Sequence, residues 1–430
     1  MLPEEIRKEI ISLIKREVVP AMGCTEPVAV SLCTAKAVEL LGCRPQKIEV
    51  RLSPNVLKNA MGVGIPGTGM IGLPIAVALG AIVGRSEYKL EVLKDTTPQA
   101  VEEGKRMIAD ECIKIALKEG LCDMLYIEVV AMAEGNSATA IISGAHTNFV
   151  YVERNGEVLH DSRMPLGVAA ESNGDIELTF EKVWKFATAS PIDELRFILE
   201  ARDLNKAIAE ESLKGEWGHC LGRTISDVAQ QAIFGNTTFT RMVSYTSAAC
   251  DARMGGAKIP VMSNSGSGNQ GIASTLPVVV YAEEIKASEE QLIRALVLSH
   301  LSVIYIKQSL GRLSALCGCV VASTGSSCGI TYLMGGGFTE ASMAVKNMVA
   351  NLTGVICDGA KPSCALKLAS AVSTALFSAV MAIEHRCVTS LEGIVDDDVD
   401  RSIRNLTSIG SKGMQQTDNM ILSIMTSKQK

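Results

Sequence analysis

Aromatic residues and charges of either sign are scarce in this chain of 430 residues. It holds 2 Trp, 7 Tyr and 8 Phe, and charged residues make up 20% of the total. Acidic residues number 47 against 41 basic ones, without any basic block, which argues against a nucleic-acid partner. With 47% hydrophobic residues, the chain is neither disordered nor coiled-coil. We therefore expect a large core of aliphatic side chains, packed closely at the 37 glycines.

An apolar leader is also missing from the first residues. MLPEEIRKEI is charged and amphipathic, which predicts a cytoplasmic protein. Three uncharged stretches, 61–84, 259–282 and 313–339, are long enough to span a bilayer. They are rich in glycine or short polar residues, and the first two also contain proline. We expect buried walls of a site in these places, and no membrane partner.

Cysteine, in contrast, is frequent, with 13 residues. The number is odd and the chain is long, so a secreted disulfide scaffold does not fit. In a reducing compartment these cysteines are packing residues, metal ligands or reactive thiols. Because free Cys is among the most buried residue types, we expect most of them to fill the core.

Hydrophobic periodicity predicts an α+β fold. Apolar residues every four positions predict a helix over 3–18, and a second helix is expected over 25–41, with Thr25 as N-cap and Gly42 after its end. From 46 to 165 the pattern changes to strands, including KIEVRLSP and YKLEVLKD, with one charged helix from Pro98 to Gly120. Asn155-Gly156 predicts a type I′ hairpin.

Two domains follow from this pattern. Residues 1–45 and 166–430 are expected to form a large, mainly α-helical catalytic domain. Residues 46–165 are expected to form a smaller inserted α+β domain with a mixed or antiparallel sheet. The helices after residue 224 are apolar and rich in small residues, which is typical of helices buried on most sides.

Cys24 in AMGCTEP directly precedes a predicted helix. A thiol at a helix N-terminus lies at the positive end of the helix dipole, which lowers its pKa and favours a thiolate. Such a thiolate can act as base or nucleophile. A structural cysteine at a turn explains the position equally well.

A second group of cysteines lies late in the chain. It comprises Cys317, Cys319 and Cys328, followed by Cys357 and Cys364. Six residues separate Cys357 and Cys364 across an Asp-Gly turn, a spacing that can place two thiolates on one metal. It matches neither a zinc ribbon nor a bacterial ferredoxin. From spacing alone, a cysteine-rich helical core is the stronger interpretation.

Nine small polar residues, 263–271 with the sequence SNSGSGNQG, form the third feature. Backbone N–H groups and hydroxyls in such a run suit a carboxylate or phosphate, and a flexible surface loop is the alternative. No GK[ST] follows, so the run is not a P-loop. A similar polar patch is Lys58-Asn59 followed by the glycine loop at 64–69, which lacks the context of a dinucleotide site. The five histidines are scattered, and we expect structural roles for His219 and His385.

Five ordered motifs together resemble the L-cysteine desulfidase family, which is related to the α chain of iron–sulfur L-serine dehydratases. They are GCTEP at 23–27, KNAMGVGIPGTG at 58–69, SNSGSGNQGI at 263–272, ALCGC at 315–319 and CDGAKPSC at 357–364. The resemblance covers nearly the whole chain. The alternating unit at 46–165 would correspond to the smaller domain of the dehydratases.

The resemblance implies a [4Fe-4S] cluster held by Cys357, Cys364 and one residue of the ALCGC pair. Cys317 aligns better than its rival Cys319. It also implies β-elimination of L-cysteine to hydrogen sulfide, ammonia and pyruvate without pyridoxal phosphate. The open iron of the cluster would serve as Lewis acid and Cys24 as base. The residues expected to bind the amino-acid substrate are Lys58, Asn59, Gly67, Thr68, Ser263, Asn264, Ser265, Gly266, Ser267, Gly268 and Asn269.

Two other functions stay open at this level. L-serine differs from L-cysteine by one atom, so L-serine dehydratase is the first alternative. A thiol-rich metal or redox sensor without enzyme activity is the second, although the sequence shows no output surface such as a basic patch. A homodimer is expected.

Overall fold

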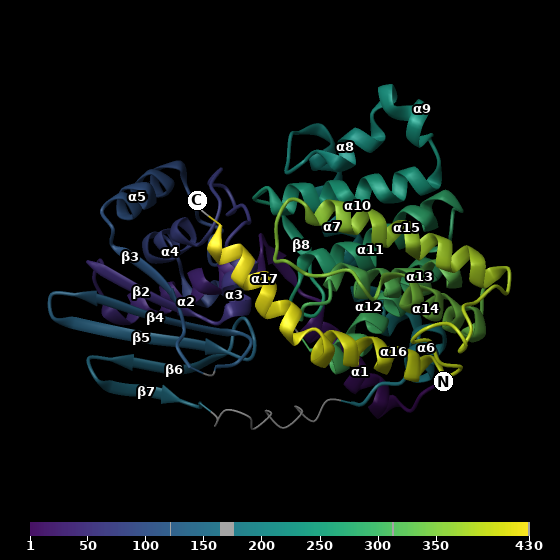
Figure 1. Ribbon diagram of the computed structural model, residues 1–430, viewed down its shortest axis with the longest axis horizontal. Helices are drawn as coiled ribbons and strands as arrows, with labels where there is room; N and C mark the ends of the chain where they lie inside the picture. The colour runs from purple at the N-terminus through teal and green to yellow at the C-terminus, as the bar shows by residue number, and fades with distance from the viewer. Residues whose placement is uncertain (121, 164–175, 312–313, 429–430) are drawn as a thin grey trace.

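The computed structural model describes residues 1–120, 122–163, 176–311 and 314–428. The chain forms two parts that lie side by side, a sheet covered by helices and a larger assembly of helices (Figure 1). The predicted α+β class, with a mainly helical larger part, is confirmed. The expected boundary between residues 165 and 166 lies outside the described residues.

A six-stranded mixed sheet, in the order β3-β2-β4-β5-β6-β7, forms the smaller part. β2 runs parallel to β3, and all other neighbours are antiparallel. Its strands are β2 (Lys47–Leu52), β3 (Ile113–Leu117), β4 (Tyr126–Ala133), β5 (Asn136–Ser143), β6 (Phe149–Arg154) and β7 (Glu157–Asp161). Asn155 and Gly156 have φ angles of 50° and 84°, as the predicted type I′ turn requires.

Four helices belong to this part, α2 (Thr25–Leu41), α3 (Pro54–Ala60), α4 (Leu73–Ile82) and α5 (Pro98–Ala109). α2 ends before Gly42 as predicted, but Cys24 rather than Thr25 is its N-cap residue. α2 packs on β4 and β5, and its side chains from Val28 onward lie in the core around the sheet. The sequence pattern instead groups this helix, within residues 1–45, with the helical part. Its apolar and small residues on all sides allow it to be covered by the sheet on one side and by α4 on the other.

Two segments of this part differ from the sequence prediction. YKLEVLKD is not a strand, because it forms part of a 3₁₀ helix, η1 (Ser86–Glu91), and a turn that buries Val92 and Leu93. The helix predicted from Pro98 to Gly120 stops at Ala109, and IKIAL continues as β3. The helix ends because Glu111 has a φ of 55°, which a helix does not tolerate. The following residues form a strand because β2 offers them hydrogen-bond partners, which local periodicity does not reveal.

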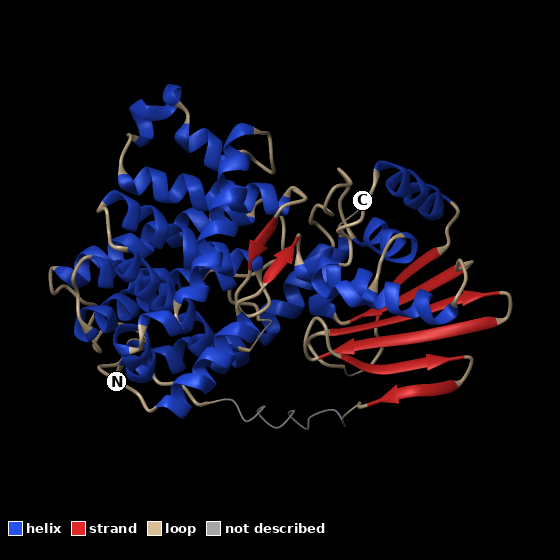
Figure 2. Cartoon of the chain, turned by 180° about the vertical axis from the view of Figure 1, so that it is seen from behind, coloured by secondary structure: helices blue, strands red, loops and turns tan. Residues whose placement is uncertain are grey.

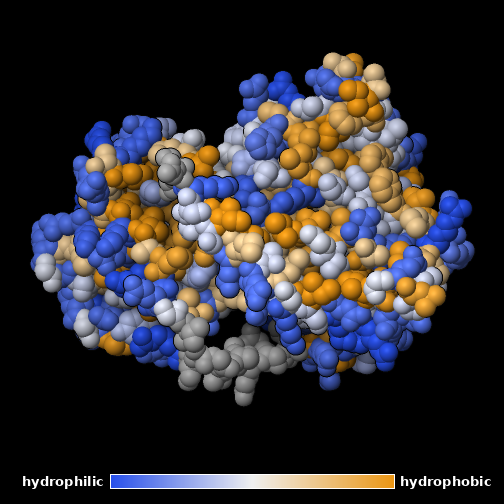
Figure 3. Space-filling view, viewed as in Figure 1, coloured by the Kyte–Doolittle hydropathy of each residue, from blue (hydrophilic) through white to orange (hydrophobic). Residues whose placement is uncertain are grey.

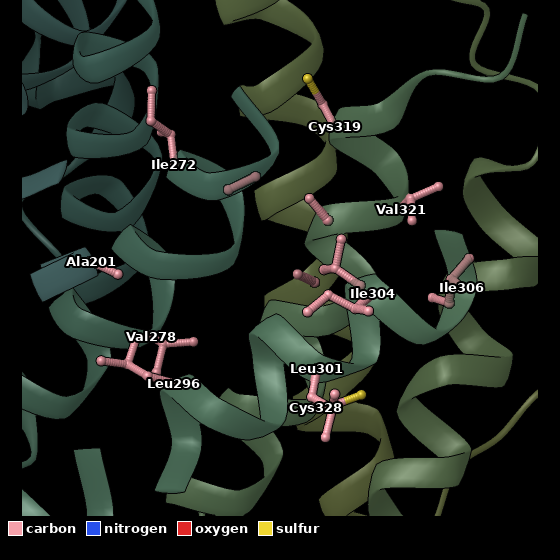
Figure 4. Packing of buried hydrophobic residues seen from close by; sticks show 14 of the residues in the cluster. Ala201, Ile272, Val278, Leu296, Leu301, Ile304, Ile306, Cys319, Val321 and Cys328 are labelled. Carbon is pink, nitrogen blue, oxygen red and sulfur yellow. The ribbon is translucent and has the colours of Figure 1, made fainter. Parts of the chain in front are cut away.

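The larger part consists of helices around a central one, α13, which packs against α11, α12, α14 and α15. The long helices are α1 (Glu4–Glu17), α6 (Phe180–Ala189), α7 (Leu199–Lys214), α10 (Thr238–Met254), α11 (Gly268–Glu284), α12 (Glu289–Leu310), α13 (Gly318–Leu333), α14 (Phe338–Leu352), α15 (Cys364–Ile383), α16 (Val399–Ser408) and α17 (Gln415–Ser427). Short ones are η2 (Ile192–Glu194), η3 (Arg196–Ile198), α8 (Leu221–Ser226), η4 (Val228–Gln230), α9 (Gln231–Phe234) and η5 (Ile409–Gly413). Aliphatic side chains fill the core, with Cys319 and Cys328 among them (Figure 4).

The three uncharged stretches supply α4, α11 and α13, whose residues are almost all buried inside the protein. Among the described residues, one helix, Cys364–Ile383, is long and apolar enough to cross a membrane by length and composition, and 44% of its apolar window is buried. Leu366 and Phe377 of this helix are both exposed. Apolar patches interrupt the polar surface on the face shown in Figure 3.

A two-stranded sheet joins segments far apart in the chain. β1 (Pro20–Met22) pairs antiparallel with β8 (Pro260–Met262), and the pair lies between the two parts (Figure 2). Cys24 stands one residue beyond Gly23, which follows β1, and the Ser263–Asn269 run follows β8. The two chemistry-bearing segments therefore meet although about 240 residues separate them.

Candidate active site

One pocket gathers most of the residues that the sequence analysis singled out. Its empty volume is about 730 Å³, part of it open to solvent. Both parts of the fold contribute to it. The chemically active residues around it are Cys24, Glu26, Asn59, His146, Arg253, Ser265, Ser267, Asn269, Gln270, Cys317, Cys319, Cys357, Cys364 and Lys367.

Cys24 is buried at the start of α2 and its thiol donates a hydrogen bond to Glu26 Oε2 at 3.1 Å. Thr25 Oγ1 donates to the carbonyl of Gly266 at 2.8 Å, which ties this turn to the polar run after β8. Burial, together with the negative charge of Glu26, raises the pKa of the Cys24 thiol well above its ordinary value. The lowered pKa expected from the helix dipole is therefore wrong, because desolvation outweighs the dipole.

Glu26 is a buried carboxylate with several hydrogen-bonding neighbours. Besides Cys24, the amide of Asn59 donates to its Oε1 at 3.0 Å, and His146 Nε2 lies 3.9 Å from the same oxygen. Burial raises the pKa of Glu26, but His146 and the Cys24 thiol more than offset this and lower it to about 2. Glu26 therefore carries a negative charge in the pocket.

The late cysteines come together through short backbone pairings. The Cys317 N–H donates to the carbonyl of Val355 at 2.9 Å, and the Cys357 N–H donates to that of Ala315 at 2.6 Å. Cys317 is the N-cap residue of α13, and Cys364 is the first residue of α15. Two helix starts and one loop thus bring three thiols to one pocket.

The turn between Cys357 and Cys364 requires glycine at one position. Gly359 has a φ of 93°, and a Cβ there would lie 2.2 Å from the carbonyl oxygen of Lys58. A side chain would push this loop away from α3 and from the pocket. The Asp-Gly pair that the sequence analysis read as a turn therefore also sets the approach of the cysteine loop to the smaller part of the fold.

The thiols differ in their readiness to ionise. A hydrogen bond from the Cys319 thiol, helped by the positive charge of Lys367, lowers the pKa of Cys317 to about 7 despite burial. The same interaction and burial raise the pKa of Cys319, and burial raises that of Cys364 to about 12. Because metal ligation requires thiolates, bound metal would have to stabilise Cys364 in its deprotonated form.

Thiolate sulfur is the donor that iron–sulfur clusters require. Within the described ranges, no three His, Cys, Asp or Glu side chains are close enough together to hold one metal ion. In a [4Fe-4S] cluster each iron takes its own thiolate, so the ligands surround the group instead of converging on one point. Four thiols, Cys317, Cys319, Cys357 and Cys364, face one pocket, and this donor set fits an iron–sulfur cluster.

The polar run after β8 enters the pocket only in part. Ser265, Gly266, Ser267 and Asn269 line it, and Ser265 and Gly266 both have positive φ angles of 48° and 80°. The N–H groups of Ser265 and Ser267 donate to the carbonyls of Glu17 and Asn264, so an anion would meet the N–H groups at the start of α11.

Other residues of this run serve the scaffold. Ser263 Oγ donates to the carbonyl of Val19 at 2.6 Å, and the amide of Asn264 bonds to buried His300. Gly268 does not line the pocket but makes room for Arg253, since a Cβ at 268 would lie 2.3 Å from the guanidinium Nε.

Three further residues expected at the substrate lie away from the pocket. Lys58 Nζ forms a buried ion pair with Asp418 of α17 and donates to the carbonyl of Cys357 at 3.3 Å. Thr68 Oγ1 bonds to the carbonyl of Ile65, and the Gly67 N–H bonds to that of Gly256. Asn59 does line the pocket.

Five of the chemically active pocket residues were not predicted individually from the sequence. They are Glu26, His146, Arg253, Gln270 and Lys367. Glu26 stands in the GCTEP motif and Gln270 in the polar run, so closeness to singled-out residues could have indicated both. His146 and Arg253 carry no local pattern, because only the fold brings them to Cys24 and the polar run.

A buried pocket that combines grouped thiols, a carboxylate and a guanidinium at the junction of a helical and a sheet-containing part is typical of a small-molecule enzyme site. The sequence pattern of the family described as "Serine dehydratase alpha chain" matches residues 87–423. The chain belongs to this family, as the motif resemblance predicted, and the family relation indicates a dehydratase-like lyase.

The chain is also similar to whole proteins of several bacteria. A UPF0597 protein of Phocaeicola vulgatus is 65% identical to it over 430 residues, and the alignment covers 100% of both chains. UPF0597 proteins of Porphyromonas gingivalis and Aeromonas hydrophila subsp. hydrophila are 56% and 45% identical. These alignments cover 98% of this chain and 99% and 96% of the two relatives.

Proposed function

We propose that the protein is a β-eliminating lyase that converts L-cysteine to hydrogen sulfide, ammonia and pyruvate. The observation that carries this proposal is the meeting of Cys317, Cys357 and Cys364 with Cys24 in one pocket. Membership of the serine dehydratase alpha chain family supports the reaction class.

Cys317, Cys357 and Cys364 would hold a [4Fe-4S] cluster. A cluster with three protein thiolates has one iron without a protein ligand, which supplies a Lewis acid for the leaving group. Cys317 is preferred over Cys319 because its backbone pairs with the strand-like segment that carries Cys357. Cys319 then acts as hydrogen-bond donor to Cys317.

Cys24 would take the Cα proton of the substrate. The Cys24 thiol must first lose its own proton, and the carboxylate of Glu26 accepts its hydrogen bond at 3.1 Å. Loss of the Cα proton and of sulfide from Cβ leaves aminoacrylate, which tautomerises and takes up water to give pyruvate and ammonia. The N–H groups at the start of α11 and the Ser267 hydroxyl would bind the substrate carboxylate.

L-serine is the second candidate substrate, because the family description names serine. The elimination is the same with hydroxide in place of sulfide as leaving group. A non-enzymatic thiol-based sensor would use the same cluster ligands but would not need a buried thiol and carboxylate beside them.

Anaerobic preparation followed by iron and sulfide analysis tests the cofactor, and release of sulfide and pyruvate from L-cysteine and L-serine tests the reaction. Cys24→Ala should abolish turnover and keep the iron, whereas Cys357→Ala should lose both. Cys250→Ala is the matched control, since this buried cysteine lies near the same thiols without lining the pocket. A protein without iron after anaerobic reconstitution, or with iron and no turnover of either amino acid, contradicts the proposal.

The choice between Cys317 and Cys319 has its own test. Cys317→Ser should lose iron, and Cys319→Ser should keep it with altered cluster absorbance. The reverse pattern would make Cys319 the ligand.

We further propose a cytoplasmic homodimer with no membrane or nucleic-acid partner. Cell fractionation tests the location, and light scattering of the purified protein tests the dimer. Recovery in the membrane fraction or a monomeric mass would contradict the respective part.

A further inference from the structure

Two opposite charges are buried in the pocket without forming an ion pair with each other. Arg253 is 2% exposed and Glu26 is 7% exposed. In the part of the chain that the structure describes, no carboxylate lies within 4.0 Å of the guanidinium of Arg253. Among the same residues, His146 is the one basic side chain within 4.0 Å of the Glu26 carboxylate, at 3.9 Å. Buried charges are normally paired, because removing them from water is costly.

The guanidinium of Arg253 is turned toward the polar run at the start of α11. Its Nη1 donates to Asn269 Oδ1 at 2.9 Å, and its Nε is buried without a partner. α11 is a long helix that begins at Gly268, and Ser265 to Ser267 precede it with positive φ angles at the first two. The N–H groups of Ser265 and Ser267 donate to backbone carbonyls, so the N–H groups at the start of α11 are the backbone donors left for a ligand. Together with a guanidinium that lacks a carboxylate partner, they form a binding site for an anion.

The part of the pocket formed by α2 and α3 offers acceptors beside Cys24. Glu26 is anionic, and Asn59 Oδ1 beside it is a buried acceptor without a partner. These oxygens suit a group with several N–H donors and a positive charge, such as an ammonium.

We propose that Arg253 and Glu26 bind the two charged groups of a zwitterionic α-amino acid, the carboxylate at Arg253 and the ammonium at Glu26. This inference deepens the proposed function and rests on it for the reaction, but it concerns binding and assigns the residues that select the substrate class. Plain carboxylic acids and plain amines would leave one of the two charges unpaired.

The position of Cys24 agrees with this orientation. The charges of Arg253 and Glu26 both act on its thiol, with opposite sign. An amino acid that bridges the two charges presents its Cα near the sulfur. Its ammonium also neutralises Glu26, which removes one of the causes that keep Cys24 protonated.

Binding of L-alanine tests the inference independently of turnover, because alanine has no leaving group at Cβ. Its affinity for the full-length protein, measured by calorimetry, is compared with propionate, which lacks the ammonium, and with ethylamine, which lacks the carboxylate. Losing one charge-assisted contact should weaken binding roughly 10- to 150-fold. Propionate binding as tightly as L-alanine, or no binding of L-alanine, would overturn the inference.

Two variants test which residue binds the carboxylate and which binds the ammonium of the amino acid. Glu26→Gln should remove the advantage of L-alanine over propionate, and Arg253→Gln should remove its advantage over ethylamine. Each comparison is made within one variant, so a change in stability does not affect it. Glu39→Gln on α2 and Arg241→Gln on α10 are matched controls on the same helices, both at the surface, and should leave both advantages unchanged.

The outcomes separate this inference from the proposed reaction. Charge-dependent binding of L-alanine without turnover of L-cysteine or L-serine upholds the binding pair and refutes the reaction. The binding pair alone is refuted if the protein turns over L-cysteine while Glu26→Gln still binds L-alanine more tightly than propionate and Arg253→Gln still binds it more tightly than ethylamine.

Discussion

Lys58 is a residue for which a role in substrate binding and a role in stability make different predictions. The sequence motif placed it at the substrate, whereas its ammonium is buried against Asp418 of α17 and the carbonyl of Cys357. The side chain of Lys58 is 2% exposed and that of Asp418 is 18% exposed. The ion pair thus joins α3, the C-terminal helix and the cysteine loop.

Asp418→Asn leaves the ammonium of Lys58 buried without a counterion. Removing one partner of a buried pair costs about 3–5 kcal/mol, and the partial exposure of Asp418 reduces this to about 2–3 kcal/mol. Lys58→Met leaves the carboxylate near water instead, so we expect a smaller loss, about 1–2 kcal/mol. For 430 residues the entropy of unfolding is about 0.9 kcal/mol/K, so each kcal/mol lowers Tm by about 1 °C.

Thermal unfolding under anaerobic conditions measures these losses of stability. Iron content and KM for L-cysteine are measured on the same variants. The double variant Lys58→Met/Asp418→Leu should lose less stability than the sum of the single changes, because no charge stays unpaired. Lys105→Met, which removes an exposed ion pair with Glu102, is the control and should change Tm very little. An increased KM with unchanged Tm in Lys58→Met would refute the structural role and place Lys58 at the substrate.

Three further predictions concern the site and its support. Because burial and the charge of Glu26 raise the pKa of the Cys24 thiol well above its ordinary value, kcat/KM for L-cysteine should still increase with pH above pH 8, and a plateau below pH 8 would contradict Cys24 as base. Gly359→Ala should lose about 1–3 kcal/mol of stability and the bound iron, since its φ is 93° and the carbonyl of Lys58 is in the way. Gly354→Ala, with no atom near the added Cβ, is its control, and iron retained in Gly359→Ala would refute the argument. Burial lowers the pKa of His300 to about 3 from 6.5, so below pH 6.5 the unfolded chain takes up a proton that the folded protein does not. His300 should therefore reduce stability by up to about 1.4 kcal/mol per pH unit between pH 6.5 and 3, and an unchanged acid slope of urea unfolding in His300→Gln would exclude this.

Local sequence was sufficient for elements that carry their own pattern. The first helix, the helix over 25–41 and the Asn155-Gly156 turn are present because spacing, a stop residue and a turn pair specify them within a few neighbours. It failed at IKIAL, where a parallel partner decided between helix and strand. It also failed at YKLEVLKD, whose apolar residues are buried without any strand pairing.

The site shows the same division. The motifs around Cys24, Ser265, Cys317 and Cys357 pointed to residues that the pocket unites. The pKa expected for Cys24 was wrong because it depended on a neighbour, Glu26, and on burial, neither of which the helix position reveals.

The sequence by itself determined the aliphatic, glycine-rich and cysteine-rich character of the chain, its family and the short motifs that contain thiols and small polar residues. Only the tertiary structure decided which of those residues face one pocket, that Lys58 supports the C-terminal helix, and that Arg253 and His146 belong to the site. The physical reason is distance along the chain. A motif is defined by neighbours in sequence, whereas desolvation, ion pairing and charge complementarity depend on neighbours in space that arrive from separate helices and strands.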